Sequence, residues 1–163
     1  MSIIVFSRPV RSGKTTELME YCDKVAGTKS IGGILMPDVD GSRKLFNIET
    51  KEWFDIECKD PSDTTRQLVT VGRFYFYADV FEKANSIISE AATKCDLLII
   101  DEVGKLELEG KGFYKGVKGV LEKEKYKNGK SSVLLVVRQE LYEPVLLFFE
   151  ITKHRLINKI SDI

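Results

Sequence analysis

Residues 3–16 read IIVFSRPVRSGKTT. The apolar residues that open this stretch predict a buried strand over about residues 2–7, and the apolar spacing behind it predicts a helix over about residues 15–26. A loop between a buried strand and a helix N-terminus presents backbone N–H groups to phosphate oxygens, while a lysine reaches the outer phosphates and a hydroxyl group binds Mg²⁺. Lys14 and Thr15 hold those two positions. The stretch therefore predicts a phosphate-binding loop in an α/β fold.

The loop matches its general pattern only in part. The pattern G-x-x-x-x-G-K-[S/T] requires a glycine five positions before Gly13, where this chain has Arg8. The tripeptide G-K-[S/T] alone is expected by chance in about one chain in ten of this length, so its place between a strand and a helix gives it weight, and the alternative is an ordinary basic turn. The residues predicted to bind the nucleotide are Arg8, Pro9, Val10, Arg11, Ser12, Gly13, Lys14, Thr15 and Thr16.

A second motif, LLIIDE, occupies residues 97–102. Four apolar residues followed by two acids predict a buried parallel strand whose carboxyl end brings carboxylates to the crevice of the sheet. In that arrangement Asp101 holds Mg²⁺, usually through water, and Glu102 accepts a proton from the water that attacks the γ-phosphate. A glutamate at this position favours hydrolysis over transfer to another substrate. The alternative is a strand that ends in solvent with two charges.

Length and charge limit the possible classes of protein. The chain of 163 residues has the size of a single domain, for which we take residues 1–163 as a whole. Its 25 basic and 25 acidic residues give a net charge of zero, so the sequence shows no overall electrostatic preference for nucleic acid. No apolar stretch approaches the roughly 18 residues needed to span a bilayer, and none is long enough for a signal-peptide core. These features predict a cytoplasmic protein without a membrane partner.

The cysteines do not suggest a disulfide framework or a zinc site. Cys22, Cys58 and Cys95 are odd in number and far apart, and His154 is the only histidine. This pattern suits a reducing cytosol. One histidine without a paired serine or cysteine also does not suggest a nucleophilic triad.

The rest of the chain alternates strands with helices around a β-rich insertion. Alternating apolar residues predict a hairpin that turns near Thr50-Lys51, within an insertion over about residues 38–77. Asp79 and Glu82 predict a capping box at the start of the next helix. The other elements are predicted as strands over 30–36, 68–71, 74–77 and 133–137 and as helices over 79–93 and 112–124, with a short helix from Pro144. This order predicts a three-layer α/β fold, a parallel sheet with helices on both faces and a β-hairpin insertion.

Four segments resemble one known family. SGKTT at 12–16, GILMPDVDGSRKLFNIETKE at 33–52, VGRFYFYADVFEKANSIISEA at 71–91 and above all LLIIDEVGKLEL at 97–108 are similar to the small nucleoside-triphosphatase family of the thermophilic-archaeal THEP and human cancer-related type. The last segment looks like the family's D-E-I-G-K-M-E-L. The resemblance implies a RecA-like or AAA-like P-loop core and slow, Mg²⁺-dependent hydrolysis of ATP, GTP and other nucleoside triphosphates to diphosphate and phosphate.

The resemblance also implies roles for single residues. It implies that Lys14 and Thr15 bind the phosphates and the metal, that Asp101 binds a metal-bound water and that Glu102 activates the nucleophile. Lys105 is a further catalytic candidate in the matching segment, and Glu107 of the same segment is a candidate site residue. Residues 152–155 look like the family's late segment with an Asn-Arg pair, so Arg155 is expected near the nucleotide, with His154 in place of the asparagine.

Some positions depart from the family. Its loop resembles G-x-x-G-x-G-K-T-T, and Arg8 and Arg11 replace the first two glycines. Either arginine adds a cation beside the phosphates or points to solvent. Where the family often has a polar residue late in the strand at 133–137, this chain has valines followed by Arg138.

Two other functions remain open from the sequence. A nucleotide or nucleoside kinase is possible because SGKTTEL also resembles the thymidine kinase loop, although that class's zinc-type cysteine pairs and an arginine-rich lid are missing from the sequence. A nucleotide-binding switch module with little turnover is the second possibility. The sequence specifies neither the base preference nor the oligomeric state.

Overall fold

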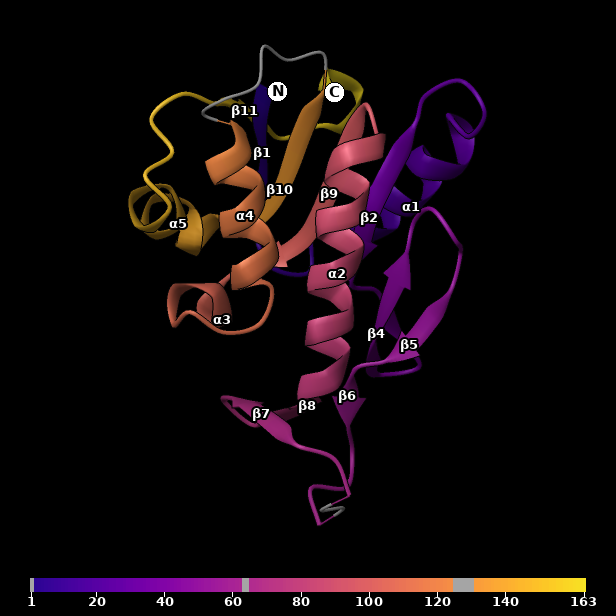
Figure 1. The fold of residues 1–163 in the computed structure, drawn as a ribbon, viewed down its shortest axis with the longest axis vertical. Coiled ribbons are helices and arrows are strands. Elements are labelled where there is room, and N and C mark those ends of the chain that lie inside the picture. The colour runs from indigo at the N-terminus through magenta and orange to yellow at the C-terminus, as the bar shows by residue number, and fades with distance from the viewer. Residues whose placement is uncertain (1, 63–64, 125–130) are drawn as a thin grey trace.

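The computed structural model describes residues 2–62, 65–124 and 131–163. Within them, eight strands form one mixed sheet at the centre of the molecule (Figure 1). Five of these strands are mutually parallel and lie side by side in the order β11 (Arg155–Ile157), β1 (Ser2–Arg8), β10 (Ser132–Arg138), β9 (Leu97–Val103) and β2 (Ile31–Leu35). Their carboxyl ends all meet at one edge of the sheet, where α/β proteins bind ligands.

Helices cover both faces of this sheet, as the sequence predicts. One face packs against α1 (Lys14–Lys24), whose Leu18 and Cys22 are buried in one core cluster with Phe6 and Ile99. The other face packs against α2 (Ala78–Lys94), α4 (Tyr114–Glu124) and α5 (Tyr142–Phe148), in a second core cluster that contains Val5 and Ile100. Successive strand residues therefore enter different cores, which is why the parallel strands are apolar throughout.

The β-rich insertion has two parts. The first continues the main sheet beyond β2 through the antiparallel strands β4 (Ser42–Asn47) and β3 (Asp38–Val39), and β5 (Trp53–Asp55) pairs with β4. The predicted hairpin near Thr50-Lys51 is confirmed by the pairing of Phe46 with Trp53. The second part is a separate three-stranded sheet of β6 (Glu57–Cys58), β8 (Phe74–Tyr77) and β7 (Leu68–Val71). The main sheet is therefore mixed: five of its strands are parallel, as predicted, and the strands of the insertion extend it in antiparallel orientation.

Several local predictions need correction. Helix α2 begins at Ala78 with Tyr77 as its N-cap residue, so Asp79 lies inside the first turn, where its carboxylate accepts hydrogen bonds of 3.1 and 2.6 Å from Arg66. Helix α5 begins at Tyr142 rather than Pro144, after the 3₁₀ turn η1 (Gln139–Leu141). The sequence also missed the one-turn helix α3 (Lys105–Leu108), which is too short to show a periodicity.

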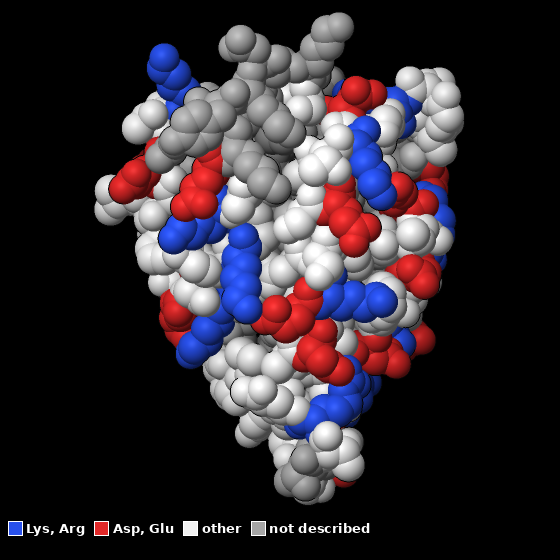
Figure 2. Space-filling model, in the orientation of Figure 1, with Lys and Arg blue, Asp and Glu red and all other residues white. Residues whose placement is uncertain are grey.

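The surface over α2 and α4 carries charges of both signs (Figure 2). Lys115 of α4 and Glu82 of α2 form one ion pair across these helices, with 2.9 Å between Nζ and Oε1.

The last element of the structure is a 3₁₀ turn, η2 (Ile160–Asp162). None of the helices in the described part of the chain is long and apolar enough to cross a bilayer.

Candidate nucleotide-binding and catalytic site

The predicted phosphate-binding loop connects the carboxyl end of β1 to the first turn of α1. The loop reverses its direction with two residues in the left-handed region, Arg11 with a φ of 57° and Gly13 with a φ of 81°. Glycine adopts such angles at little cost. Arg8, which replaces the family's first glycine, has no positive φ and is the last residue of the extended strand β1. The missing glycine is therefore not needed for the backbone at that position.

The side chain of Arg8 stabilises the loop through hydrogen bonds and an ion pair with other residues of the protein. Its Nη2 and Nη1 donate to Oε1 and Oε2 of Glu17 at 2.7 and 3.2 Å, and the same guanidinium donates to the carbonyl and the hydroxyl oxygen of Ser12. These contacts tie the start of the loop to its end and to the first turn of α1. Arg8 is thus engaged within the protein, whereas Arg11 is exposed to solvent.

Lys14 lies in the hollow of the loop. Its side chain is buried, and Nζ donates to the backbone carbonyls of Arg8 at 3.2 Å and Pro9 at 2.9 Å. Burial lowers the pKa of Lys14, and the nearby Glu102 and Asp101 carboxylates limit that decrease. The ammonium group is therefore held at the loop by weak acceptors that the more strongly charged oxygens of a phosphate can replace.

The remaining predicted binding residues line the mouth of the loop. Pro9, Val10, Arg11 and Thr16 are exposed, and Ser12 is half-buried. The loop and the first turn of α1 thus leave an open side where backbone N–H groups of a helix N-terminus are available to an anion.

Thr15 and Asp101, the two predicted metal ligands, are in direct contact. Thr15 Oγ1 donates to Asp101 Oδ2 at 2.8 Å across 86 residues of sequence. The Asp101 side chain is buried and also accepts from the N–H groups of Met36 at 3.0 Å and Glu102 at 2.9 Å. Burial raises the pKa of Asp101, and the neighbouring Glu102 raises it further. The contact joins the loop to the acidic strand β9.

A β-bulge places the acid pair at the end of β9. Ile100 pairs with Leu135 and Val103 with Val137, so β9 has one residue more than β10 between these two pairs. A regular strand would send Asp101 and Glu102 to opposite faces of the sheet. The extra residue re-aims the chain, and Glu102 has a φ of 61°, which is unfavourable for a residue with a Cβ.

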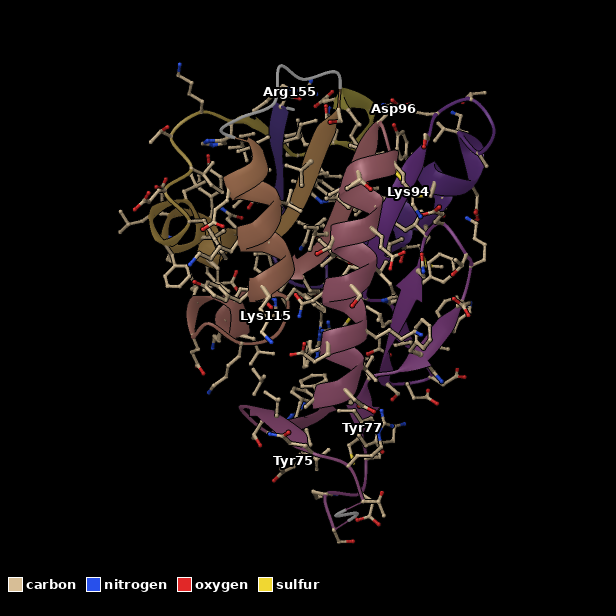
Figure 3. The ribbon with its side chains drawn as sticks, in the orientation of Figure 1. Tyr75, Tyr77, Lys94, Asp96, Lys115 and Arg155 are labelled. Atoms are coloured by element: carbon tan, nitrogen blue, oxygen red, sulfur yellow. The ribbon has the colours of Figure 1, made fainter. Side chains whose placement is uncertain are left out.

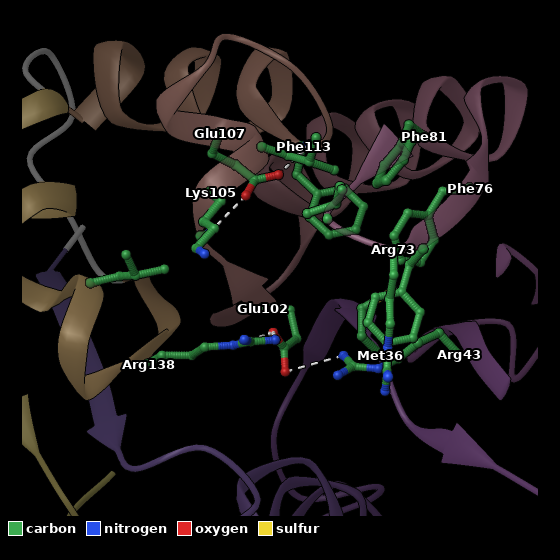
Figure 4. A pocket seen from close by; sticks show the side chains of 16 residues that line it. Met36, Arg43, Arg73, Phe76, Phe81, Glu102, Lys105, Glu107, Phe113 and Arg138 are labelled. Atoms are coloured by element: carbon green, nitrogen blue, oxygen red, sulfur yellow. Dashed lines mark hydrogen bonds and ion pairs between the residues drawn. The ribbon is translucent and has the colours of Figure 1, made fainter. Parts of the chain in front are cut away.

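Two arginines that the sequence did not single out as site residues hold the carboxylate of Glu102 (Figure 4). Arg138 Nη2 lies 3.0 Å from Oε2, and Arg43 Nη1 lies 3.2 Å from Oε1. Arg138 is the last residue of β10, next to Arg8 in the sheet. Its position directly after the buried valines and leucines of residues 133–137 could have indicated a site residue at the carboxyl end of the strand. Arg43 reaches the site only because β4 folds back on β2, which no short motif in the sequence indicates.

Lys105 and Glu107 have different surroundings. Lys105 begins α3, and its side chain faces the space in front of Glu102 (Figure 4). Glu107 is buried, and its carboxylate accepts hydrogen bonds from the N–H groups of Gly104 at 2.7 Å and Phe113 at 2.8 Å. Burial raises the pKa of Glu107, although these hydrogen bonds act against the increase. Glu107 therefore holds the segment between β9 and α4 in place.

The structure does not bring Arg155 to the loop. Arg155 pairs with Ile4 in the sheet, and its Nη1 donates to the carbonyl of Asp162 at 2.6 Å. Figure 3 shows it at the same end of the molecule as Asp96, where the parallel strands begin. The loop lies at the other end, so the expectation that Arg155 approaches the nucleotide is corrected. The sequence motif located the residue but not the register of the last strand.

Known proteins similar to this chain are found by sequence and by structure. The nucleoside-triphosphatase THEP1 of Methanosarcina barkeri is 30% identical over an alignment that covers 92% of this chain and 90% of that protein. THEP1 of Korarchaeum cryptofilum is 32% identical over 74% of this chain and 63% of its own. The crystal structure of THEP1 from the hyperthermophile Aquifex aeolicus superposes with a TM-score of 0.70 at 20% identity, covering 97% of this chain and 89% of that chain.

The structural match confirms the predicted α/β fold, and at 20% identity it supports no conclusion beyond the fold. The family is shown by sequence. A model of the NTPase family matches residues 3–160, nearly the whole chain, and the alignment with the M. barkeri relative covers 92% of the chain. The chain therefore belongs to the NTPase family.

Proposed function

We propose that the protein hydrolyses ATP, GTP and other nucleoside triphosphates to the diphosphate and phosphate in a Mg²⁺-dependent reaction, with Glu102 as the base that activates water. The observation that carries this proposal is the hydrogen bond of 2.8 Å between Thr15 and Asp101, because it brings the phosphate-binding loop and the acid pair to one edge of the sheet. The relatives named nucleoside-triphosphatase support the reaction class.

In this proposal the loop binds the triphosphate. The N–H groups of the first turn of α1 face the phosphate oxygens, and the open side of the loop at Pro9–Gly13 admits them. Lys14 exchanges the carbonyls of Arg8 and Pro9 for the outer phosphates. Its positive charge then opposes the negative charge that the γ-phosphate carries in the transition state.

The residues at the loop fit a magnesium ion. The hydroxyl of Thr15 and the carboxylate of Asp101 are oxygen ligands that already touch each other, and Mg²⁺ is commonly held in proteins by one or two side chains together with waters and phosphates. A bound Mg²⁺ would supply charge neutralisation at the phosphates. Deprotonated Asp101 would hold it, directly or through water, and Thr15 would turn its hydroxyl oxygen toward it.

Glu102 takes the proton of the attacking water. Its carboxylate is partly exposed and faces open space rather than the core. The ion pairs with Arg43 and Arg138 fix its orientation and engage both of its carboxylate oxygens. A γ-phosphate beside Glu102 would attract both guanidinium groups, which frees the carboxylate for the proton and adds two cations to the phosphate. The base therefore becomes available when the substrate arrives.

The proposed location is the cytoplasm, since the cysteine pattern of the sequence suits a reducing compartment.

Phosphate release from ATP and GTP in H₂¹⁸O tests the proposal. We expect release with Mg²⁺ and without any acceptor, abolished by EDTA and restored by added Mg²⁺, with one ¹⁸O atom in each phosphate formed. Release that requires a nucleoside or mononucleotide acceptor would show a kinase, and tight nucleotide binding without release would show a switch module. Either result would overturn the proposed hydrolysis.

A further inference from the structure

A pocket of about 290 Å³ opens beside Glu102, on the side away from the phosphate-binding loop (Figure 4). None of the loop residues 9–13 lines it. Its walls come from parts of the chain that are far apart in sequence: Arg43 of β4, the turn between β7 and β8, the start of α3 and the end of β10. The pocket is thus distinct from the hollow that holds Lys14, and the two meet at Glu102.

The pocket is larger than hydrolysis requires. The proposed reaction needs one attacking water near Glu102, and the share of one molecule in liquid water is about 30 Å³. The pocket has several times that volume. Its size fits a small organic molecule, which ligand pockets in proteins enclose with apolar walls and a few well-placed polar groups.

One wall of the pocket is aromatic. Phe74, Phe76, Phe81 and Phe113 follow one another along it, with ring centroids 6.4, 6.0 and 5.2 Å apart. Phe81 and Phe113 are buried in the core, whereas Phe74 is 42% exposed. This wall offers a surface on which a flat ring can pack.

The rim of the pocket is charged, with four cations and one accessible carboxylate, that of Glu102. Arg43 and Arg138 are paired with Glu102. Arg73 and Lys105 have no ion pair among the residues that the structure describes, and the guanidinium carbon of Arg73 lies 5.1 Å from the centre of the Phe74 ring. Glu107 also lines the pocket, but both of its oxygens accept backbone hydrogen bonds. The rim therefore has two positive charges without an acidic partner.

We propose that this pocket is a second ligand site, which binds a small aromatic molecule with a phosphate group, such as a nucleoside monophosphate. The phosphate lies between Arg73 and Lys105, and the ring packs on the phenylalanine wall. Two cations suit a phosphate dianion better than a single carboxylate charge. The site extends the proposed function, since a ligand there faces the γ-phosphate across Glu102, but the binding itself does not depend on turnover.

Calorimetry of binding tests the proposal with the phosphate-binding loop saturated with Mg²⁺ and the diphosphate. The probes are AMP, GMP and CMP, with adenosine as a ring without an anion and ribose 5-phosphate as an anion without a ring. We expect each mononucleotide to bind at least tenfold more tightly than either fragment. Arg73→Ala and Phe74→Ala should each weaken mononucleotide binding about tenfold, and both side chains are exposed enough to be removed without unfolding.

Two further variants separate this pocket from the loop. Arg155→Ala removes an exposed arginine at the far end of the sheet and should leave AMP binding unchanged. Lys14→Ala, measured without the diphosphate, should also leave AMP binding to the pocket unchanged. Binding that is lost in Lys14→Ala but kept in Arg73→Ala would place AMP in the loop and overturn the proposal, as would equal binding of AMP and ribose 5-phosphate.

The outcome is independent of the hydrolysis test. A wild-type protein that releases phosphate from ATP but binds no mononucleotide contradicts the second site only. A wild-type protein that binds AMP through Arg73 but releases no phosphate contradicts the proposed hydrolysis only.

Discussion

The two sides of Glu102 differ in how their charges are balanced. On the loop side, Arg8 is paired with Glu17 and Lys14 with backbone carbonyls. On the pocket side, Arg73 and Lys105 have no acidic partner in the described chain. The loop is organised by its own residues before any ligand arrives, so a ligand there replaces existing contacts. In the pocket, a ligand would supply the negative charge that Arg73 and Lys105 lack. These two side chains should therefore gain more from a bound anion than the residues of the loop do.

Among variants of the two sides, the largest effect is expected on the loop side. Lys14→Ala should lower kcat/KM for ATP by about 10²–10³-fold, the range found when one preorganised donor to a transition-state charge is removed. The measurement is Mg²⁺-dependent phosphate release, with exposed Lys29→Ala as the control. Activity within threefold of wild type would show that the loop does not bind the reacting phosphate.

Removal of a buried hydrogen bond of Glu107, which lines the pocket, should lower the stability of the protein. Glu107→Gln replaces one of two acceptor oxygens with a donor that faces a backbone N–H, so the free energy of unfolding should fall by about 1–3 kcal/mol. Urea unfolding measures this change. The matched control is Glu109→Gln, an exposed residue paired with Lys111, which should change the value by less than about 0.5 kcal/mol. Equal effects of the two variants would contradict the structural role of Glu107.

A pair of arginine variants tests the comparison itself. Arg8→Met breaks a partly buried ion pair, so it should reduce the free energy of unfolding by up to about 1 kcal/mol. Arg73→Met breaks no ion pair of the described chain and should leave stability unchanged while it weakens AMP binding. Chemical unfolding and calorimetry on both variants measure the contrast. The opposite pattern, a stable Arg8→Met and a destabilised Arg73→Met, would contradict the assignment of charges to the two sides.

The smallest effect concerns pH. Because burial raises the pKa of Glu107 in the folded protein, protonation favours the folded state. The contribution of this carboxyl group to stability is present below its unfolded pKa, near 4.5, and is lost as the pH rises through the higher folded pKa. The difference in unfolding free energy between wild type and Glu107→Gln should therefore decrease as the pH rises above 4.5. A difference that grows over that range would mean that the hydrogen bonds outweigh burial.

The same comparison explains what the sequence could predict. The loop contacts span only four to nine residues, as between Arg8 and Glu17, and short motifs encode such geometry. The acid pair was also predictable, because an apolar run that ends in Asp101-Glu102 is local. The alternation of apolar segments was enough to predict the layers of the fold.

The pocket side was not predictable in this way. Arg43 and Arg73 reach the pocket through the insertion, whose strands pair partly with the main sheet and partly with one another. The bulge at Glu102 depends on the register of β9 against β10, which no apolar pattern specifies. Arg155 shows the same difficulty, since its position follows from the pairing of β11 with β1. Long-range strand pairing therefore accounts for most of what the sequence left open.

The most direct test of the central claim is Glu102→Gln, measured for both nucleotide binding and phosphate release. The substitution keeps the size of the side chain and removes its basicity. We predict that the affinity for Mg²⁺-ATP stays within about threefold of wild type while phosphate release falls by about 10²–10⁴-fold, the usual contribution of a general base. Hydrolysis at the wild-type rate by Glu102→Gln would contradict the account.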